Sequence, residues 1–148
     1  MPERETVERA RKDAREGKSA STQAGEFVRE EVHHVREGKH GVRSTRQAIA
    51  IGLSKARRAG VDLPPPDEGH TEEQRDQAER DLEDGETPHE PSPRRSRAVS
   101  KALKREGRTA ASRSALSKHA KQAARARSPK ARSRQAKRAA QTRRRSSR

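Results

Sequence analysis

The clearest hydrophobic pattern in the chain predicts an amphipathic helix over residues 22–37. Its apolar residues recur every third or fourth position, which is the spacing of one helical face: Ala24, Phe27, Val28, Val32 and Val35. Gly38 follows, where a helix commonly ends in the left-handed conformation that glycine adopts easily. The apolar spacing therefore predicts the helix, and Gly38 predicts its C-terminal end.

A second amphipathic helix is predicted after the turn Gly38-Lys39-His40-Gly41. Ser44 and Gln47 have the spacing of a capping box, which satisfies free amides at a helix start. The apolar stripe that follows consists of Ala48, Ile49, Gly52, Leu53 and Ala56. Gly60 and the prolines at 64–66 end it. Residues 22–60 are thus expected to form an αα-hairpin, and the fold class is all-α.

The segments on either side of the hairpin have little to bury. Residues 1–21 are expected to form a marginal N-terminal helix or arm that frays, because only Val7, Ala10 and Ala14 make its stripe. Residues 61–93 form a Pro-rich, acidic linker. Thr71 and Gln74 repeat the capping-box spacing, so residues 71–83 are expected to be transiently helical.

Residues 94–148 form a basic tail rich in Arg, Lys, Ala and Ser. Residues 94–106 and 109–127 are helix candidates, and an echo of the hairpin's Arg-Glu-Gly motif suggests a degenerate second hairpin over 94–127. Residues 130–148 are of low complexity. The tail is expected to be disordered, or helical only when a polyanion neutralises it, because its apolar face is Ala-rich.

The hairpin alone has a small core. The chain has one Phe, no Trp and no Tyr, and only 26% of its residues are hydrophobic. The apolar stripe therefore has two alternatives, which the sequence leaves open: self-association into a homo-oligomer, or packing of other helices of the chain against it.

Charge divides the chain more sharply than hydropathy does. Residues 1–60 carry 14 Lys and Arg against 9 Asp and Glu, residues 61–93 carry 2 against 12, and residues 94–148 carry 21 against 1. A net charge of +15 for the whole chain therefore combines a strongly acidic linker with a strongly basic tail.

Several classes of function are not supported. There is no cysteine for a disulfide or a thiolate site, no phosphate-binding glycine loop and no nucleophile elbow, so we expect neither an enzyme, nor a cofactor, nor a small-molecule substrate. Glu30 and His34 have helical spacing, but without cysteine or an H-E-x-x-H motif no dedicated metal site is predicted. No membrane span or secretory signal is seen, which favours a cytoplasmic location and at most reversible membrane adsorption.

Residues 38–60 resemble a bacterial family of small basic proteins defined by a domain of unknown function. The resemblance covers residues 24–63 and centres on Gln-Ala-Ile-Ala-Ile-Gly-Leu-Ser at 47–54. Members of that family are often labelled DNA-binding. The resemblance implies a short helical module with basic extensions and no known catalytic residue, and the acidic linker departs from it. The tail is similar to those of linker histones and bacterial histone-like proteins.

Together these features predict a sequence-independent DNA-binding protein of the nucleoid, whose tail contacts phosphates. The residues expected to contact phosphate are Arg94, Arg95, Arg97, Lys101, Lys104, Arg105, Arg108, Arg143, Arg144 and Arg145. Ser92-Pro93-Arg94-Arg95 also has the form of a minor-groove turn, although Ser92 is equally suited to a helix boundary. The acidic linker is expected to compete with DNA for the tail.

Two alternative functions remain open at this stage. The first is an RNA-binding or ribosome-associated protein, for which the lack of aromatic residues disfavours single strands but not structured RNA. The second is a stress or protein-interaction protein that does not bind nucleic acid.

Overall fold

The computed structural model describes residues 1–66 and 70–147, and within them it has seven α-helices, one short 3-10 helix and no β-strand. The fold is all-α, as predicted. The chain divides into two compact units, residues 1–112 (the N-terminal unit) and residues 113–148 (the C-terminal unit). The helices are α1 (Arg4–Arg15), α2 (Ala20–Glu37), α3 (Thr45–Arg58), α4 (Glu72–Glu86), α5 (Pro93–Lys104), η1 (Thr109–Ala111), α6 (Arg113–Ala126) and α7 (Pro129–Ser146).

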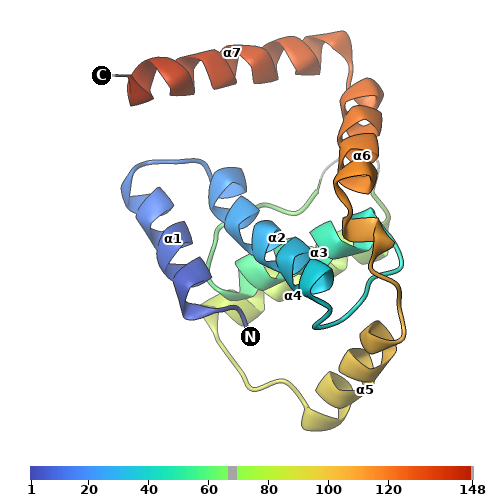
Figure 1. Ribbon diagram of the computed structural model, residues 1–148. Helices are drawn as coiled ribbons and strands as arrows, with labels where there is room; N and C mark the ends of the chain where they lie inside the picture. The colour runs from blue at the N-terminus through green and yellow to red at the C-terminus, as the bar shows by residue number, and fades with distance from the viewer. Residues whose placement is uncertain (67–69, 148) are drawn as a thin grey trace. The chain divides into compact units, whose positions relative to one another are not determined.

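Helices α2 and α3 pack against each other as the predicted hairpin (Figure 1). Gly38 ends α2 with a left-handed φ of 81°. The Ser44 side chain accepts a hydrogen bond from the Gln47 N–H at 3.1 Å and so caps α3. In a capping box the Gln47 side chain would accept from the Ser44 N–H, but here it accepts from the N–H of the preceding residue, Arg43. The local signals at these helix ends are therefore confirmed.

Gly52 sets how closely α2 and α3 approach. It is buried, and a Cβ built on it would lie 2.6 Å from the Val28 Cα and 2.9 Å from the Val28 N. These are backbone atoms of the facing helix, which cannot rotate away as a side chain can. Any larger residue at position 52 must therefore push the two helices apart.

One hydrophobic core joins α1, α2 and α3 around Phe27, which is 1% exposed. Its buried partners are small: Ala10, Ala24, Ala56 and Val61. Further buried apolar residues lie nearer the turn of the hairpin or in the segments next to it, namely Val32, Val35, Val42, Ala48 and Ala111. A single large side chain among alanines brings the helix backbones close together.

The expectation that residues 1–21 form a fraying arm is not what the structure shows, because α1 packs against α2 (Figure 1). Thr6 and Ala10 are buried, and Val7 packs against the core. Since α1 supplies this cover, another helix of the same chain packs against part of the hairpin.

Polar contacts at two places add to this packing. The Glu3 N–H donates to Glu30 Oε2 at 3.1 Å, and Arg9 Nε donates to Glu26 Oε2 at 2.7 Å. Hydrogen bonds from His34 and from Lys39 lower the pKa of Glu3 to about 2. The small apolar stripe of α1 is thus supplemented by ionic groups that match those of α2.

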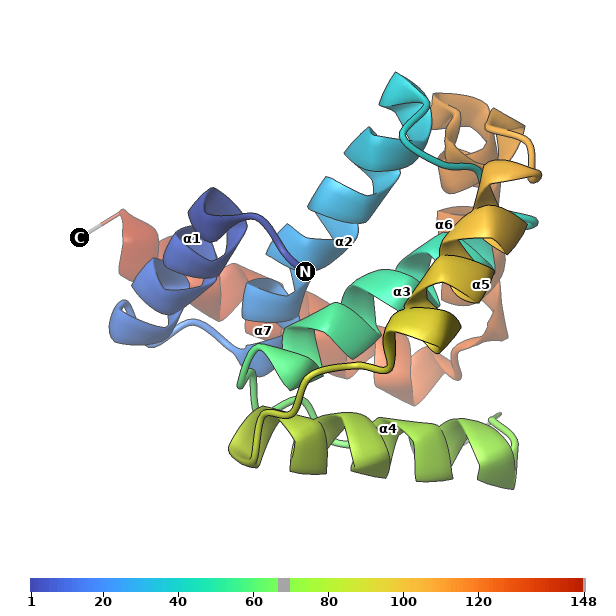
Figure 2. The same cartoon turned by 90° about the horizontal axis from the view of Figure 1, so that it is seen from below.

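The acidic segment also differs from the expected linker, because α4 packs against α3. Figure 2 shows α3 between α2 and α4. Ala78 and Asp81 are buried, and Arg58 Nε donates to Asp81 Oδ1 at 2.8 Å. The predicted capping box of Thr71 and Gln74 is present. The hydrophobic pattern did not predict the packing of α4 on α3, because α4 has only one fully buried apolar residue, Ala78. The ion pair between Arg58 and Asp81 supplies the other main contact.

The first part of the basic tail belongs to the N-terminal unit. The Gly41 and Val42 N–H groups donate to Leu103 O and Gly107 O, each at 2.9 Å. Two α2 and α3 side chains reach the same segment: Arg36 Nε donates to Ala111 O at 2.7 Å, and Thr45 Oγ1 to Ala110 O at 2.6 Å. Residues 94–148 are therefore not one free tail, since residues 103–111 are bound to the hairpin turn.

The remainder of the tail is helical where the structure describes it, which corrects the expectation of disorder. Helix α7 covers most of the low-complexity stretch 130–148. It begins at Ser128, whose side chain accepts from the Ala131 N–H at 3.2 Å, with Pro129 at the first helical position. Ala, Arg, Lys and Gln all have high helix propensity, so low complexity here does not oppose a helix. The suggested second hairpin over 94–127 spans the division between the two units.

Candidate nucleic-acid interface

Helix α5 presents a stripe of cations along one side. Arg94, Arg97, Lys101, Lys104 and Arg105 follow one another at helical spacing, and all are exposed. Four of these five residues line a shallow depression together with Ser100, the exception being Arg94. The stripe therefore offers several donors on one open, shallow helix face, which suits a phosphate backbone better than a small ligand.

Two of the predicted contact residues lie away from this stripe. Arg95 is exposed but lies on another side of α5, one residue after Arg94. The Arg108 side chain lies over Gly38, since a Cβ on that glycine would meet Arg108 Nη1 at 2.9 Å. A guanidinium at the C-terminal end of α2 interacts favourably with the helix dipole. Arg108 therefore contacts the end of α2, in addition to the phosphate contact that the sequence predicts for it.

Helix α7 has a second cationic face, which the sequence analysis missed. Lys130, Arg134, Lys137, Arg138 and Arg145 lie at i, i+4, i+7, i+8 and i+15, and each is exposed. Of the predicted cluster Arg143 to Arg145 in the last turn, Arg145 shares this face. The signal was present as helical spacing of cations within residues 130–148, but a low-complexity interpretation hides spacing of that kind.

The division into two units places nearly all of the net charge in the C-terminal unit. Of the 37 Lys and Arg residues 14 lie in residues 113–148, whereas none of the 22 Asp and Glu does. The C-terminal unit therefore has a net charge of +14. The remaining 112 residues have 23 cations and 22 acidic groups, a net charge of +1. The division after residue 112 thus places the seven cations of residues 94–108 in the N-terminal unit.

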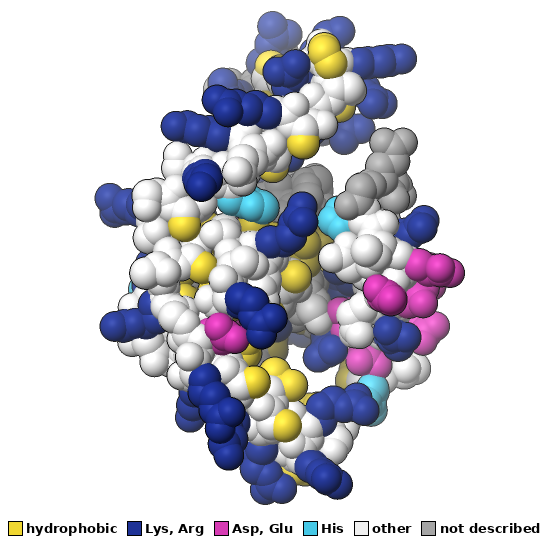
Figure 3. Space-filling view, turned by 90° about the vertical axis from the view of Figure 1, so that its right-hand side faces the viewer, with side chains coloured by type: hydrophobic (Ala, Val, Ile, Leu, Met, Phe, Trp, Pro, Cys, Tyr) yellow, Lys and Arg dark blue, Asp and Glu magenta, His cyan; other side chains and the backbone are white. Residues whose placement is uncertain are grey.

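Lys and Arg side chains project over much of the face seen in Figure 3, where most of the visible Asp and Glu side chains gather in one region. The acidic side chains of α4 are mostly exposed, but Asp81 is buried against Arg58. Among the described residues, the ion pairs of α4 also join Asp84 to Arg58 and to His89. The paired carboxylates are therefore those that attach α4, and the others face solvent.

The structure does not gather the ten predicted contact residues into one site. Seven of them, Arg94 to Arg108, belong to the N-terminal unit, and Arg143, Arg144 and Arg145 belong to the C-terminal unit. Both S-P motifs stand at helix starts, with Ser92 before α5 and Ser128 before α7. Ser92 therefore lies at a helix boundary, which is one of the two positions that the sequence suggested for it.

Helices α1 to α3 and the following proline run fall within a match to a protein-family model. Residues 4–66 match the model of a family of unknown function (DUF6496). The match to DUF6496 begins well before the resemblance over 24–63 and ends before α4, so both cationic surfaces lie outside it. No curated protein and no solved structure matches the chain. In the part of the chain that the structure describes, no helix has the length and apolarity to cross a membrane.

Proposed function

We propose that this protein binds duplex DNA without reading its sequence and without catalysis, and that the C-terminal unit supplies most of the affinity. The observation that carries the proposal is the separation of charge: residues 113–148 hold 14 cations and no acidic residue, and each described cation is exposed. A nucleoid location in the cytoplasm follows from this proposal.

The physical reason is counterion release. Each cation that neutralises a phosphate contributes a slope of about −0.9 to the dependence of log K on log salt, which amounts to about eightfold in affinity at 0.1 M salt relative to 1 M. Helix α7 has eight cations in its 18 residues, a length of about 27 Å at 1.5 Å per residue. That spacing allows several phosphate contacts at once, and phosphate contacts carry no sequence information directly.

The N-terminal unit has a different role in this proposal. Its net charge of +1 gives it little attraction for a polyanion as a whole, although the stripe on α5 adds a local cationic surface. We propose that the N-terminal unit is a folded domain that adds phosphate contacts through α5.

The test is a triple substitution on α7. Arg143→Gln, Arg144→Gln and Arg145→Gln should together weaken binding of the full chain to a DNA duplex by up to about 500-fold at 0.1 M salt, since three contacts are removed at about eightfold each. The slope of log K against log salt should become less steep by up to about 2.7. Fluorescence anisotropy with a labelled duplex at several salt concentrations measures both quantities.

The matched control removes the same charge elsewhere. Arg4, Arg11 and Arg15 are exposed residues of α1, and their replacement by Gln also lowers the net charge by three. This variant should bind within about threefold of the unchanged chain. Equal losses in the two triple variants would show that total charge, not the C-terminal unit, determines binding. Preference for an RNA duplex over a DNA duplex in competition would favour the ribonucleic-acid alternative.

We further propose that the acidic segment competes with DNA for the cationic helices. Asp76, Glu79 and Glu83 are exposed on α4, so their neutralisation leaves the Asp81 contact to Arg58 in place. Changing them to Asn, Gln and Gln should raise DNA affinity several-fold at 0.01 M salt. The gain should shrink at 0.15 M, where the Debye length falls from about 30 Å to about 8 Å. The same anisotropy assay at the two salt concentrations measures it.

The control for this prediction neutralises Glu5, Glu8 and Glu16, which are exposed acidic residues of α1 or of its end. It changes the net charge equally but lies further along the chain from the cationic helices. If both variants gain equally at 0.01 M salt, the acidic segment acts only through net charge and serves as a spacer.

A further inference from the structure

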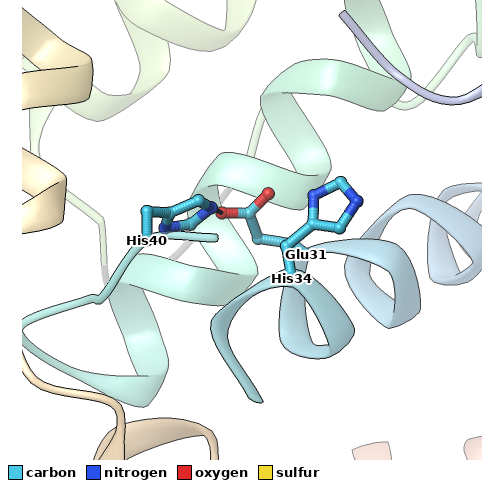
Figure 4. A group of neighbouring side chains, drawn as sticks. All are labelled: Glu31, His34 and His40. Carbon is cyan, nitrogen blue, oxygen red and sulfur yellow. Dashed lines mark ion pairs between the residues drawn. The ribbon is translucent and has the colours of Figure 1, made fainter. Parts of the chain in front are cut away.

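A buried cluster of one carboxylate and two imidazoles lies beside the hairpin turn. Glu31 and His34 are one turn apart on α2, and His40 returns to the same place after the left-handed turn at Gly38. Figure 4 shows the Glu31 carboxylate between the two rings. Glu31 is fully buried, and the side chains of His34 and His40 are 11% and 16% exposed.

The hydrogen bonds of the two rings determine which nitrogen atoms face the carboxylate. His40 Nδ1 lies 2.9 Å from the Gly41 carbonyl oxygen, and His34 Nε2 lies 2.9 Å from Glu3 Oε1. Both oxygen atoms accept, so these two nitrogen atoms carry protons. A neutral His40 then presents Nε2, and a neutral His34 presents Nδ1, each with a lone pair. Metal-binding histidines have this arrangement, in which the second ring nitrogen donates to a carbonyl or a carboxylate.

One oxygen of the carboxylate between the rings accepts no hydrogen bond from the protein. Glu31 Oε1 lies 3.0 Å from His40 Nε2, yet it accepts no hydrogen bond. Glu31 Oε2 accepts from Lys55 Nζ at 2.8 Å, and the same lysine lies 3.5 Å from Glu30 Oε1, which is also buried and accepts no hydrogen bond. Lys55 therefore faces two buried carboxylates, and the second cation of this group is His40, whose Nε2 pairs with Glu31 Oε1 at 3.0 Å when the ring is protonated. With His40 neutral, one negative charge is left without a balancing cation.

We infer that Glu31, His34 and His40 bind a divalent transition-metal ion, with Zn²⁺ as the best-suited one, through Glu31 Oε1, His34 Nδ1 and His40 Nε2. Two imidazoles and one carboxylate are an established zinc ligand set. One candidate ligand atom from each of the three residues lies within 4.8 Å of those of the other two. Tetrahedral zinc with bonds of about 2.1 Å needs separations of about 3.4 Å, a closure that small side-chain rotations supply.

The ion would join the end of α2 to the loop that carries Gly41 and Val42. That loop binds residues 103 and 107 through two backbone hydrogen bonds. The ion would therefore stabilise the loop to which residues 103 and 107 are hydrogen-bonded. A water molecule would fill the remaining coordination position. This role is independent of whether the protein binds DNA.

The experiment uses the full chain, freed of metal with a chelator and titrated with Zn²⁺ in a calorimeter. One equivalent should bind and should raise the midpoint of thermal unfolding. His40→Ala should lower the Zn²⁺ affinity at least 100-fold. This residue lies in the loop and outside the Phe27 core, so the variant should fold. Glu31→Gln should have a similar effect on affinity.

The control is His33→Gln, because His33 lies on α2 beside His34 but its side chain is 67% exposed. This variant should bind Zn²⁺ as the unchanged chain does. Absorption of the Co²⁺-loaded chain adds a readout of the ligand set, and its ligand-field bands should be lost in His40→Ala but kept in His33→Gln. Absence of stoichiometric binding by the unchanged chain, or equal affinities of the His33 and His40 variants, would overturn the inference.

Discussion

A chain that ends at Ser112 is expected to lose more than about 1,000-fold of its affinity for duplex DNA at 0.1 M salt and still fold. The loss follows because this truncation removes 14 cations and no acidic residue. Four phosphate contacts at about eightfold each already exceed the stated factor. The shortened chain has a net charge of +1, and its remaining attraction for DNA comes mainly from the stripe on α5.

Folding of the shortened chain is expected because the removed residues form a separate compact unit. The Phe27 core, α1 and α4 all lie in residues 1–112, as do the hydrogen bonds between the turn and residues 103–111. Far-UV circular dichroism and thermal unfolding check the fold, and anisotropy measures binding. A folded chain of 112 residues that binds DNA within tenfold of the full chain would contradict the assignment of affinity to residues 113–148.

The second large effect concerns two glycines in neighbouring helices, which should respond to alanine with opposite signs. Gly52→Ala should destabilise the protein by about 2 kcal/mol, because the new Cβ would overlap the Val28 backbone. Gly25→Ala should stabilise it by about 0.5 to 1 kcal/mol, because Gly25 is an exposed residue of α2 with nothing within 4 Å of the added atom.

Urea unfolding followed by circular dichroism measures both changes, with equal m values as the sign that the unfolded state is unaffected. Each substitution replaces glycine by alanine inside a helix, so the difference in propensity is the same and only the contact differs. Stabilisation by both substitutions would mean that α2 and α3 do not approach as closely as the Gly52 contact requires.

The hairpin was predictable because the residues that determine its helices and helix ends lie within or next to those helices. Gly38, Ser44 and Gly60 mark helix ends through their own backbone and side-chain properties, and the stripe around Phe27 needs only helical spacing. These features act within a few residues, so a single sequence contains them in full.

The packing of α1 and α4 was not predictable in the same way. It depends on pairs such as Arg9 with Glu26 and Arg58 with Asp81, which are 17 and 23 residues apart. In a chain with 40% charged residues many such pairs are available, and hydrophobic spacing does not select among them. Counting apolar residues alone therefore underestimated the stability of both helices.

The candidate interface was partly predictable. The count of cations predicts a polyanion surface, but their division between two units depends on the contacts of residues 103–111 with the hairpin turn. The His40 position shows the same limit. Helical spacing paired Glu30 with His34, whereas the turn at Gly38 brings His40 to Glu31. Long-range contacts of this kind have no signal in spacing along the chain.

The most direct measurement of the central claim is the slope of log K against log salt for DNA binding by the full chain and by the chain ending at Ser112. If each of the eight α7 cations neutralises one phosphate, the slope of the full chain should be steeper than that of the shortened chain by about 7. The shortened chain should give a slope no steeper than about −4.5, from the five cations of the α5 stripe. Equal slopes for the two chains would contradict the claim that residues 113–148 are the principal DNA-binding surface.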